Sequence, residues 1–189
     1  MLISPKSVVD LAEIDNKMTS LISEVKEIVQ ASNFEEKFTF KLDETNNYSG
    51  INELNWGGIY LIEIKTESTN SSIDWIEEFC NEWQKPEYVR CFVPNIKKKR
   101  TRFHFDNVVQ EWFPLYIGKS RNISRRIKEH LDLKLTQPTT SLKLRERKNM
   151  YGHEFRVSTI KIETVNYDII APQFESVMRD KINPILGRQ

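Results

Sequence analysis

The chain has 189 residues, of which 39% are hydrophobic and 29% are charged. This length and composition predict one domain with a substantial core. They exclude a disordered chain and a membrane-spanning helix, because no apolar run approaches the roughly 18 to 20 residues that such a helix needs. Two cysteines without CxxC spacing, Cys80 and Cys91, exclude a disulfide scaffold and a zinc module. The first residues lack the pattern of a secretory signal, so we expect a reduced, cytoplasmic protein with no membrane partner.

The total charge of +1 hides a strong asymmetry along the chain. Residues 1–87 contain 7 Lys and Arg against 17 Asp and Glu, a net charge of −10. Residues 88–189 contain 21 basic and 10 acidic residues, a net charge of +11. Such asymmetry favours a polyanionic partner that docks on the second half. Two solvated faces that neutralise each other are the alternative.

A long amphipathic helix is the first element expected, within an N-terminal helical extension of residues 1–50. Its apolar side chains recur at three- and four-residue spacing and form one stripe. Packing on the following domain is the favoured role of this helix, and dimerisation is the alternative. The stripe consists of Leu11, Ile14, Met18, Leu21, Ile22, Val25, Ile28 and Val29.

Strands and one helix are expected in the middle of the chain. Residues 56–64 are rich in β-branched and aromatic side chains, which is typical of a strand. A second amphipathic helix begins at Ser71 or Ser72, either of which can cap it, and ends near Trp83. Further short strands are predicted at residues 88–93, 102–105 and 114–118, the first two of them around a polar turn.

The second half is predicted to contain two more helices, a basic helical segment and a strand. The first of these helices begins at Ser120 or Asn122 and carries an apolar residue every four positions. The last helix has Pro172 in its first turn, where proline is tolerated. The remaining segments are the basic helix at 142–149 and the strand at 154–163, and the last helix ends near residue 181.

This order of elements predicts an α/β (α+β) fold, with a small, mainly antiparallel sheet flanked by helices. One domain of residues 51–189 is expected to follow the N-terminal extension. A helix and a hairpin, inserted at about residues 68–112, are expected to stand between two strands of that domain.

Two tripeptides and the helix after them carry the strongest functional signal. The first tripeptide is Gly58-Ile59-Tyr60 and the second is Tyr116-Ile117-Gly118. Arg126 follows Tyr116 by ten residues, His130 lies four residues further on, and Glu175 lies in the last predicted helix. Both tripeptides in this order, with the helix and the late glutamate, resemble the GIY-YIG nuclease family over residues 56–63 and 113–188.

The resemblance implies hydrolysis of a DNA phosphodiester bond with Mg²⁺, for which Mn²⁺ can substitute. It implies that Tyr60 and His130 activate the attacking water and that Arg126 and Tyr116 hold the phosphate. Glu175 would bind the metal. Cleavage would leave 5′-phosphate and 3′-hydroxyl ends.

Two features differ from the family pattern. Tyr60 and Tyr116 are 56 residues apart, whereas the family joins the two strands by a short loop. The difference defines the insertion at about 68–112. In addition, many members have an asparagine twelve residues after the glutamate, where this chain has Gly187, and Asn183 or Arg188 could take its place.

Elementary chemistry supports the same positions without the family. Arg126 and His130 lie four residues apart on a helix and therefore share one face. A guanidinium suits phosphate oxygens, and a lone carboxylate suits a hydrated Mg²⁺. A phenol has a pKa near 10, and we expect nearby cations and a metal to lower the pKa of Tyr60.

Each of these residues also has a structural interpretation. Arg126 could form a surface ion pair with Asp132 or Glu129. Glu175 could be a solvated side chain paired with Arg179, and His130 could be bonded to a backbone carbonyl at a helix end. His104 and His153 are expected to be structural.

Basic residues near the two motifs are candidate DNA contacts. The densest run lies between the motifs and could follow a groove or a row of phosphates; a solvated loop is the competing interpretation. Arg145, Arg147 and Lys148 could extend the same surface. The candidate DNA-binding residues are Lys97, Lys98, Lys99, Arg100, Arg102, Lys119, Arg121 and Arg125.

The favoured function is therefore a DNA endonuclease of the restriction or genome-defence type, acting on double-stranded DNA. The resemblance places such an enzyme in a bacterium, an archaeon or a phage. A homodimer is possible, with the N-terminal helix as the candidate interface. The alternatives are a sequence-nonspecific nuclease, a catalytically inert nucleic-acid-binding module, and a protein-interaction domain built on the N-terminal helix.

Overall fold

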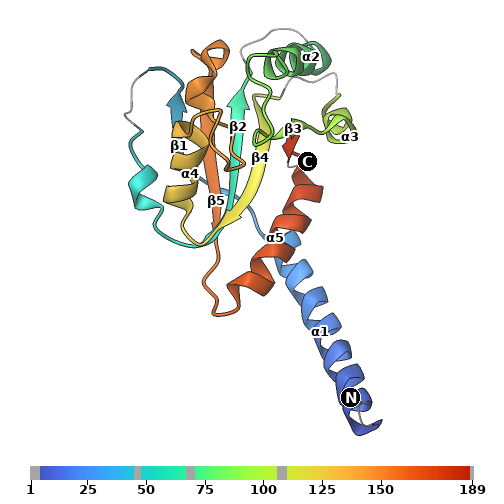
Figure 1. Cartoon of the computed structure of the whole chain (residues 1–189). Helices are drawn as coiled ribbons and strands as arrows, with labels where there is room; N and C mark the ends of the chain where they lie inside the picture. Colours follow the sequence, from blue (N-terminus) through green and yellow to red (C-terminus); the bar gives the residue numbers. More distant parts are fainter. Residues whose placement is uncertain (1–4, 45–47, 67–70, 106–109, 188–189) are drawn as a thin grey trace.

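The computed structural model describes residues 5–44, 48–66, 71–105 and 110–187, with side chains from residue 10 onward. Its centre is a four-stranded antiparallel sheet with the strand order β1-β5-β2-β4, and helices lie on both faces (Figure 1). The expected α+β fold with a mainly antiparallel sheet flanked by helices is confirmed. The four strands are β1 (Glu35–Lys41), β2 (Gly58–Lys65), β4 (Trp112–Ser120) and β5 (Glu154–Lys161).

The central strand β2 separates two hydrophobic cores. Its side chains alternate between the faces, so Tyr60 and Ile62 join one core while Ile59 and Leu61 join the other. Helices α2 and α4 belong to the Tyr60 face, and α5 with the end of α1 covers the other. The helices are α1 (Pro5–Ala31), α2 (Ser72–Trp83), α4 (Ile123–Asp132) and α5 (Tyr167–Ile182).

Strand β4 is the edge strand on the side where the two tripeptides meet. Tyr60 lies opposite Gly118, and the pairing with β2 shifts register between Ile62 and Glu63. Pro114 lies at this shift, which suits a residue that has no N–H for a sheet ladder. The C-terminal segment runs beside the same strand, because the N–H of Ile185 donates to the Pro114 carbonyl at 2.9 Å.

The predicted boundaries of two helices are refined by the structure. Asn122 caps α4, since its side-chain oxygen accepts from the N–H of Arg125 at 2.8 Å. Helix α5 begins at Tyr167, five residues before Pro172, which therefore lies inside the helix rather than in its first turn. Burial of Tyr167 and Ala171 against the sheet explains the additional turn, because packing overrides helix propensity.

The hairpin expected in the insertion is wrong. Residues 88–93 form turns between prolines, and Val89 and Phe92 remain exposed because no strand covers them. Residues 102–105 lie in or next to a single helical turn. The observed elements are the two-stranded sheet of β3 (Asn95–Ile96) with β6 (Leu186–Gly187), the helix α3 (Lys98–Thr101) and the 3₁₀ turn η2 (Arg102–His104).

Two other segments differ from the sequence prediction. The basic helix at 142–149 is wrong, because two separate 3₁₀ turns occupy this region around Arg147, which is bonded to backbone carbonyls. Residues 35–41 form β1 of the main sheet, although the sequence analysis places them in the helical extension. Phe40 of β1 stacks on Phe155 of β5, with ring centroids 5.4 Å apart. The 3₁₀ turns are η1 (Ile51–Glu53), η3 (Leu144–Glu146) and η4 (Lys148–Met150).

Helix α1 leaves the body of the protein at its N-terminal end, and only its last turns lie beside α5 (Figure 1). Val29 is fully buried there. Of the helices in the described part of the chain, none combines the length and the apolar composition required to cross a bilayer.

Arg147 is fully buried and is not part of a DNA-binding surface as the sequence suggested. Its guanidinium lies 3.5 Å from the ring centroid of Trp83 and donates to the carbonyls of Leu142, Trp83 and Tyr88. Burial lowers the pKa of Arg147. The side chain therefore joins α2 to the segment after α4 through carbonyl oxygens and an aromatic face rather than through an ion pair.

We predict that Arg147→Ala lowers the free energy of unfolding by roughly 3 kcal/mol, because it leaves buried carbonyls without donors. Lys148→Ala, at an exposed neighbouring position, is the matched control and should change it by less than about 0.5 kcal/mol. Urea unfolding followed by circular dichroism measures both. Equal effects of the two substitutions would contradict the structural role of Arg147.

Candidate functional site

The hydroxyl of Tyr60 forms the centre of a buried polar cluster. Tyr60 Oη lies 2.8 Å from His130 Nε2 and 3.2 Å from Arg126 Nε. Tyr60 is 1% exposed, His130 is 0% exposed and Arg126 is 8% exposed. The structure therefore brings three of the five predicted catalytic residues into direct contact. We call these three residues the Tyr60 cluster.

The backbone determines which nitrogen of His130 carries the proton. The N–H of Leu142 donates to His130 Nδ1 at 3.1 Å, so Nδ1 is an acceptor and the neutral ring carries its proton on Nε2. Nε2 therefore donates to Tyr60 Oη. The phenol oxygen accepts from both His130 and Arg126, and in this arrangement His130 cannot accept the proton of Tyr60.

The environment of Tyr60 acts on its pKa in two directions. Burial raises the pKa above the ordinary value, and the charges of Tyr116 and Glu175 also raise it. Arg126 opposes this rise through its charge and its hydrogen bond. The sequence analysis expected nearby cations to lower the pKa, but desolvation of the buried phenol outweighs them.

Arg126 is held on three sides. Besides Tyr60, it contacts Glu129 at 2.6 Å and the Thr140 carbonyl at 2.5 Å. The ion pair with Glu129 that was considered from the sequence is therefore present, and it coexists with the contact to Tyr60. These bonds fix the guanidinium plane and leave two of its five N–H groups outside the hydrogen bonds described here.

Gly118 allows Tyr60 to extend across the edge strand. A Cβ built at Gly118 would lie 2.2 Å from Tyr60 Oη and 2.5 Å from Cζ. The ring therefore occupies the space that a side chain at position 118 would fill. This close approach is a physical reason for glycine at the end of the second tripeptide.

The other two predicted catalytic residues face a cavity of about 480 Å³ at the outer edge of β4, which we call the edge cavity. Tyr116 and Glu175 both line it. Four cationic side chains surround the single carboxylate, so the formal charge of these five ionisable groups is +3 when Tyr116 is counted as neutral. The cationic residues are Lys97, Arg100, Lys119 and Arg179.

The Tyr60 cluster and Glu175 approach the edge strand from opposite faces. Tyr60 packs with α4, whereas Ile117 packs with α5, the helix that carries Glu175. Tyr116 links the two groups: its ring centroid is 6.3 Å from that of Tyr60 and 4.9 Å from that of His130, and it also lines the edge cavity. The five residues therefore meet around β4 rather than on one face of the sheet.

Both oxygens of Glu175 have cationic partners. Oε2 accepts from Lys119 Nζ at 2.5 Å, and Oε1 accepts from Arg179 at 2.8 Å. The pairing with Arg179 was the structural interpretation considered from the sequence. Arg179 was not a candidate site residue there, although its spacing of four residues from Glu175 is a usable signal.

A magnesium ion fits this carboxylate under one condition. Mg²⁺ accepts one or two carboxylates when it keeps several waters and binds phosphate oxygens. Glu175 faces a cavity that can hold such waters, but Lys119 or Arg179 must first release an oxygen. Among the described residues, no group of three or more His, Cys, Asp or Glu side chains is placed to hold a metal.

The eight candidate DNA-binding residues fall into three groups. Lys97, Arg100 and Lys119 line the edge cavity, where Arg100 pairs with Asp180 at 3.1 Å and Lys119 with Glu175. Arg121 and Arg125 are exposed, and each is already paired with an acidic residue, Asp168 at 2.7 Å and Glu129 at 3.1 Å respectively. The remaining three, Lys98, Lys99 and Arg102, are exposed on α3 and η2, beside Lys97 and Arg100.

The two histidines expected to be structural have different surroundings. His104 is 7% exposed, and its Nε2 lies 2.8 Å from the carbonyl of Asn183, the residue that ends α5. His153 has a buried Nδ1 with no hydrogen-bond partner.

Gly187 lies in β6, where an added Cβ would be 2.9 Å from the Lys97 side chain. Arg188 lies outside the described residues.

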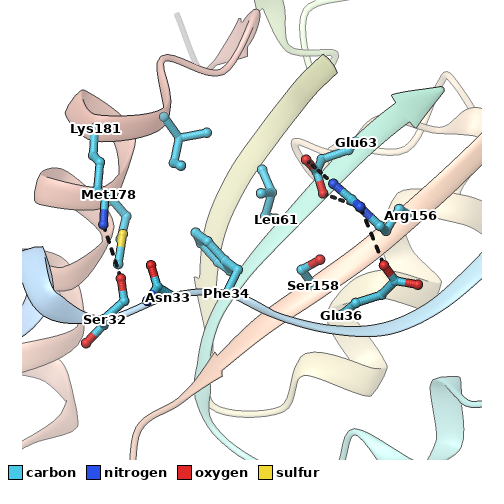
Figure 2. A pocket seen from close by; sticks show the side chains of 11 residues that line it. Ser32, Asn33, Phe34, Glu36, Leu61, Glu63, Arg156, Ser158, Met178 and Lys181 are labelled. Atoms are coloured by element: carbon cyan, nitrogen blue, oxygen red, sulfur yellow. Dashed lines mark hydrogen bonds and ion pairs between the residues drawn. The ribbon is translucent and has the colours of Figure 1, made fainter. Parts of the chain in front are cut away.

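A second cavity, of about 400 Å³, lies on the α5 face of the sheet (Figure 2). Arg156 lies between two carboxylates there, with bonds of 2.7 and 2.9 Å to Glu63 and one of 3.5 Å to Glu36. Lys181 donates to the carbonyl of Gln30 in the last turn of α1 and to that of Ser32 just after it. This cavity is a weaker candidate than the edge cavity, because none of the five predicted catalytic residues lines it.

Comparisons of the chain with protein-family models, with curated proteins and with solved structures found no match. The nuclease resemblance therefore stays a prediction that rests on the residues themselves.

We predict that Gly118→Ala lowers the free energy of unfolding by about 1–3 kcal/mol, because the new methyl group displaces the Tyr60 ring. The cost should be smaller in a Tyr60→Phe background, where the nearest atom, the hydroxyl oxygen, is absent. A double-mutant cycle by thermal or urea unfolding measures the difference. Strictly additive effects would contradict the contact between position 118 and the phenol.

Proposed function

We propose that the chain is a DNA endonuclease that hydrolyses phosphodiester bonds with Mg²⁺. The observation that carries this proposal is the phenol oxygen of Tyr60, which accepts two N–H donors beside Tyr116, next to a cationic cavity with one carboxylate. A buried oxygen with two donors is suited to negative charge. A cavity lined by four cationic side chains and one carboxylate is suited to a phosphate, which would compete with Asp180 for Arg100.

The edge cavity would bind the scissile phosphate. Lys97 and Arg100 come from the α3 segment, Lys119 from β4 and Arg179 from α5, so these positive charges can surround a phosphate rather than line one side of it. The Tyr116 hydroxyl can position a phosphate oxygen or a water molecule from the same wall. A polyanion that enters also competes with Glu175 for Lys119 and Arg179, which would free the carboxylate.

Tyr60 would act as the general base in its ionised form. The donors from His130 and Arg126 stabilise the phenolate, while burial disfavours it, so only a small fraction is ionised at neutral pH. His130 then serves as a hydrogen-bond donor that orients Tyr60, which narrows its expected role in activating the water to positioning the phenol. A bound Mg²⁺ would polarise the phosphate and support the leaving oxygen.

Arg126 has two roles that its geometry can combine. Its Nε–H donates to Tyr60, and Glu129 with Thr140 holds its plane. Two further N–H groups of its guanidinium lie outside these three bonds and could donate to a phosphate oxygen. The charge would stabilise the transition state and also the phenolate.

Recognition of particular DNA sequences would come from α3 and η2. The exposed side chains of Lys98, Lys99 and Arg102 lie in the segment that also supplies Lys97 and Arg100 to the edge cavity. Restriction-type cleavage yields discrete fragments from a mixed plasmid library, whereas a sequence-nonspecific nuclease yields a smear. This digestion separates the two enzyme hypotheses.

A DNA-binding module without catalysis is the second candidate function. Two observations favour it: both Glu175 oxygens are paired with cations, and burial raises the pKa of Tyr60. Salt-sensitive DNA binding without nicking of supercoiled plasmid in Mg²⁺ or Mn²⁺ would support the module and exclude the enzyme.

We predict that Glu175→Ala and Arg126→Ala each reduce plasmid cleavage by at least roughly 100-fold, because each removes charge stabilisation of the reacting phosphate. Both variants should still bind DNA, with affinity measured by fluorescence anisotropy. Glu154→Gln is the matched control, since Glu154 also pairs with a lysine, Lys65, at 3.0 Å. Full activity of Glu175→Ala in Mg²⁺ would contradict the proposed metal site.

We predict that the single-turnover cleavage rate rises about tenfold per pH unit between about pH 6 and pH 9. The pH lies below the raised pKa of Tyr60 throughout this range, so the ionised fraction of the phenol, which is the reactive form, grows about tenfold with each pH unit. Tyr60→Phe should lower the rate by at least about 100-fold and flatten the profile. A Tyr60→Phe variant that keeps the full slope would assign the titration to another group, such as metal-bound water.

A further inference from the structure

Helix α1 presents a row of large apolar side chains to solvent. Each is between 47% and 60% exposed, although such residues are normally covered when they lie in a continuous row. The row runs from the end that extends away from the sheet to the last turn of the helix (Figure 1). Its residues are Leu11, Ile14, Met18, Leu21 and Ile28, which we call the α1 stripe.

The spacing of this stripe is that of a two-helix coiled coil. With the half-buried Val25 included, the apolar positions are separated by 3, 4, 3, 4 and 3 residues. This is an uninterrupted a/d pattern over two and a half heptads, and a partner helix with the same spacing would cover it. Packing against the body uses the adjoining side of α1: Val29 is fully buried and Val25 also packs against that core, while Ile28 is 60% exposed.

We propose that α1 pairs with α1 of a second copy of this chain in an antiparallel arrangement, giving a homodimer. An antiparallel pair that is symmetric about the midpoint between residues 19 and 20 places every a residue opposite a d residue. Met18 then faces the partner's Leu21, and Leu11 faces the partner's Ile28. Leu and Ile are thereby covered along the whole stripe.

Charge complementarity selects this orientation. The g positions are the residues that directly precede the a residues. In an antiparallel pair the g positions of the two helices face each other, so Lys17 lies beside the partner's Glu24, and this contact occurs twice. In a parallel pair each g position faces an e position of the partner helix, the residue that directly follows a d residue, so Asp10 would lie beside the partner's Asp15. Opposite charges therefore meet in the antiparallel dimer, and like charges meet in the parallel one.

Lys17 is free enough to exchange its present partner for the partner subunit's Glu24. Lys17 now pairs with Glu13 on its own helix at 2.7 Å, and both side chains are at least 65% exposed. Such a surface pair contributes little and is readily replaced. With 27 residues, α1 is roughly 40 Å long. An antiparallel partner along it would have its own body at the opposite end of the pair, away from the first.

The first test measures the oligomeric state of the full chain by sedimentation velocity between about 1 and 100 µM, the range in which modest dimers dissociate. We expect a dimer for the wild type and at least roughly 100-fold weaker association for Met18→Glu, which places two charges in the centre of the seam. Asn16→Glu, on the opposite side of α1, is the matched control and should associate as the wild type does. A monomeric wild type, or equal effects of the two variants, would overturn the proposal.

The second test uses charge exchange, which leaves the fold unchanged. Lys17→Glu and Glu24→Lys should each weaken self-association by roughly tenfold or more, because each creates two like-charge contacts. A mixture of the two variants should form heterodimers with wild-type affinity, since both contacts then join opposite charges. Failure of the mixture to associate more tightly than either variant alone would exclude the antiparallel pairing.

Discussion

The buried hydroxyl of Tyr60 is the constraint on which the candidate site depends. Its oxygen accepts from two N–H groups, and each donor is itself fixed by the backbone: His130 by the N–H of Leu142 and Arg126 by the carbonyl of Thr140. Residues 140–142 therefore hold the cluster together from outside α4. A phenol fixed in this way cannot exchange partners easily, so its oxygen has two N–H donors already in place for a negative charge.

The same cluster limits what His130 can do. From the sequence, His130 was expected to activate the attacking water together with Tyr60. The backbone N–H at Nδ1 leaves the ring proton on Nε2, which makes His130 a donor to Tyr60. In this tautomer His130 cannot take a proton from Tyr60.

The sequence predicts the local parts of this structure well. Three features depend only on neighbouring residues, so the spacing of residue types predicts them. They are the cap at Asn122, the shared helix face of Arg126 and His130, and the two strands with their tyrosines. Strand β1 leaves a weaker signal, since only Phe38 and Phe40 alternate in it. The α+β fold could be predicted because most of its elements are individually amphipathic.

Long-range pairing explains what the sequence does not predict. Arg147 belongs to a basic run and is buried only because Trp83, 64 positions earlier, supplies an aromatic face and a carbonyl. The hairpin expected in the insertion is absent because β3 pairs with β6 at the other end of the chain. Glu175 and Tyr60 reach β4 from opposite faces of the sheet because α5 and α4 cover opposite faces. Residue spacing in the sequence does not predict which face a helix covers.

The edge strand β4 connects these observations. An open edge normally invites pairing with another strand, but the C-terminal segment covers the start of β4 through the bond from Ile185 to Pro114. From Tyr116 to Lys119 the strand instead borders a cationic cavity. A phosphate can contact residues from both faces of the sheet only at such an edge, and Gly118 makes the edge thin enough for the phenol of Tyr60 to extend across it. The position of the candidate site therefore follows from the strand order of the sheet: with β4 in the interior, a further strand would separate Glu175 from the Tyr60 cluster.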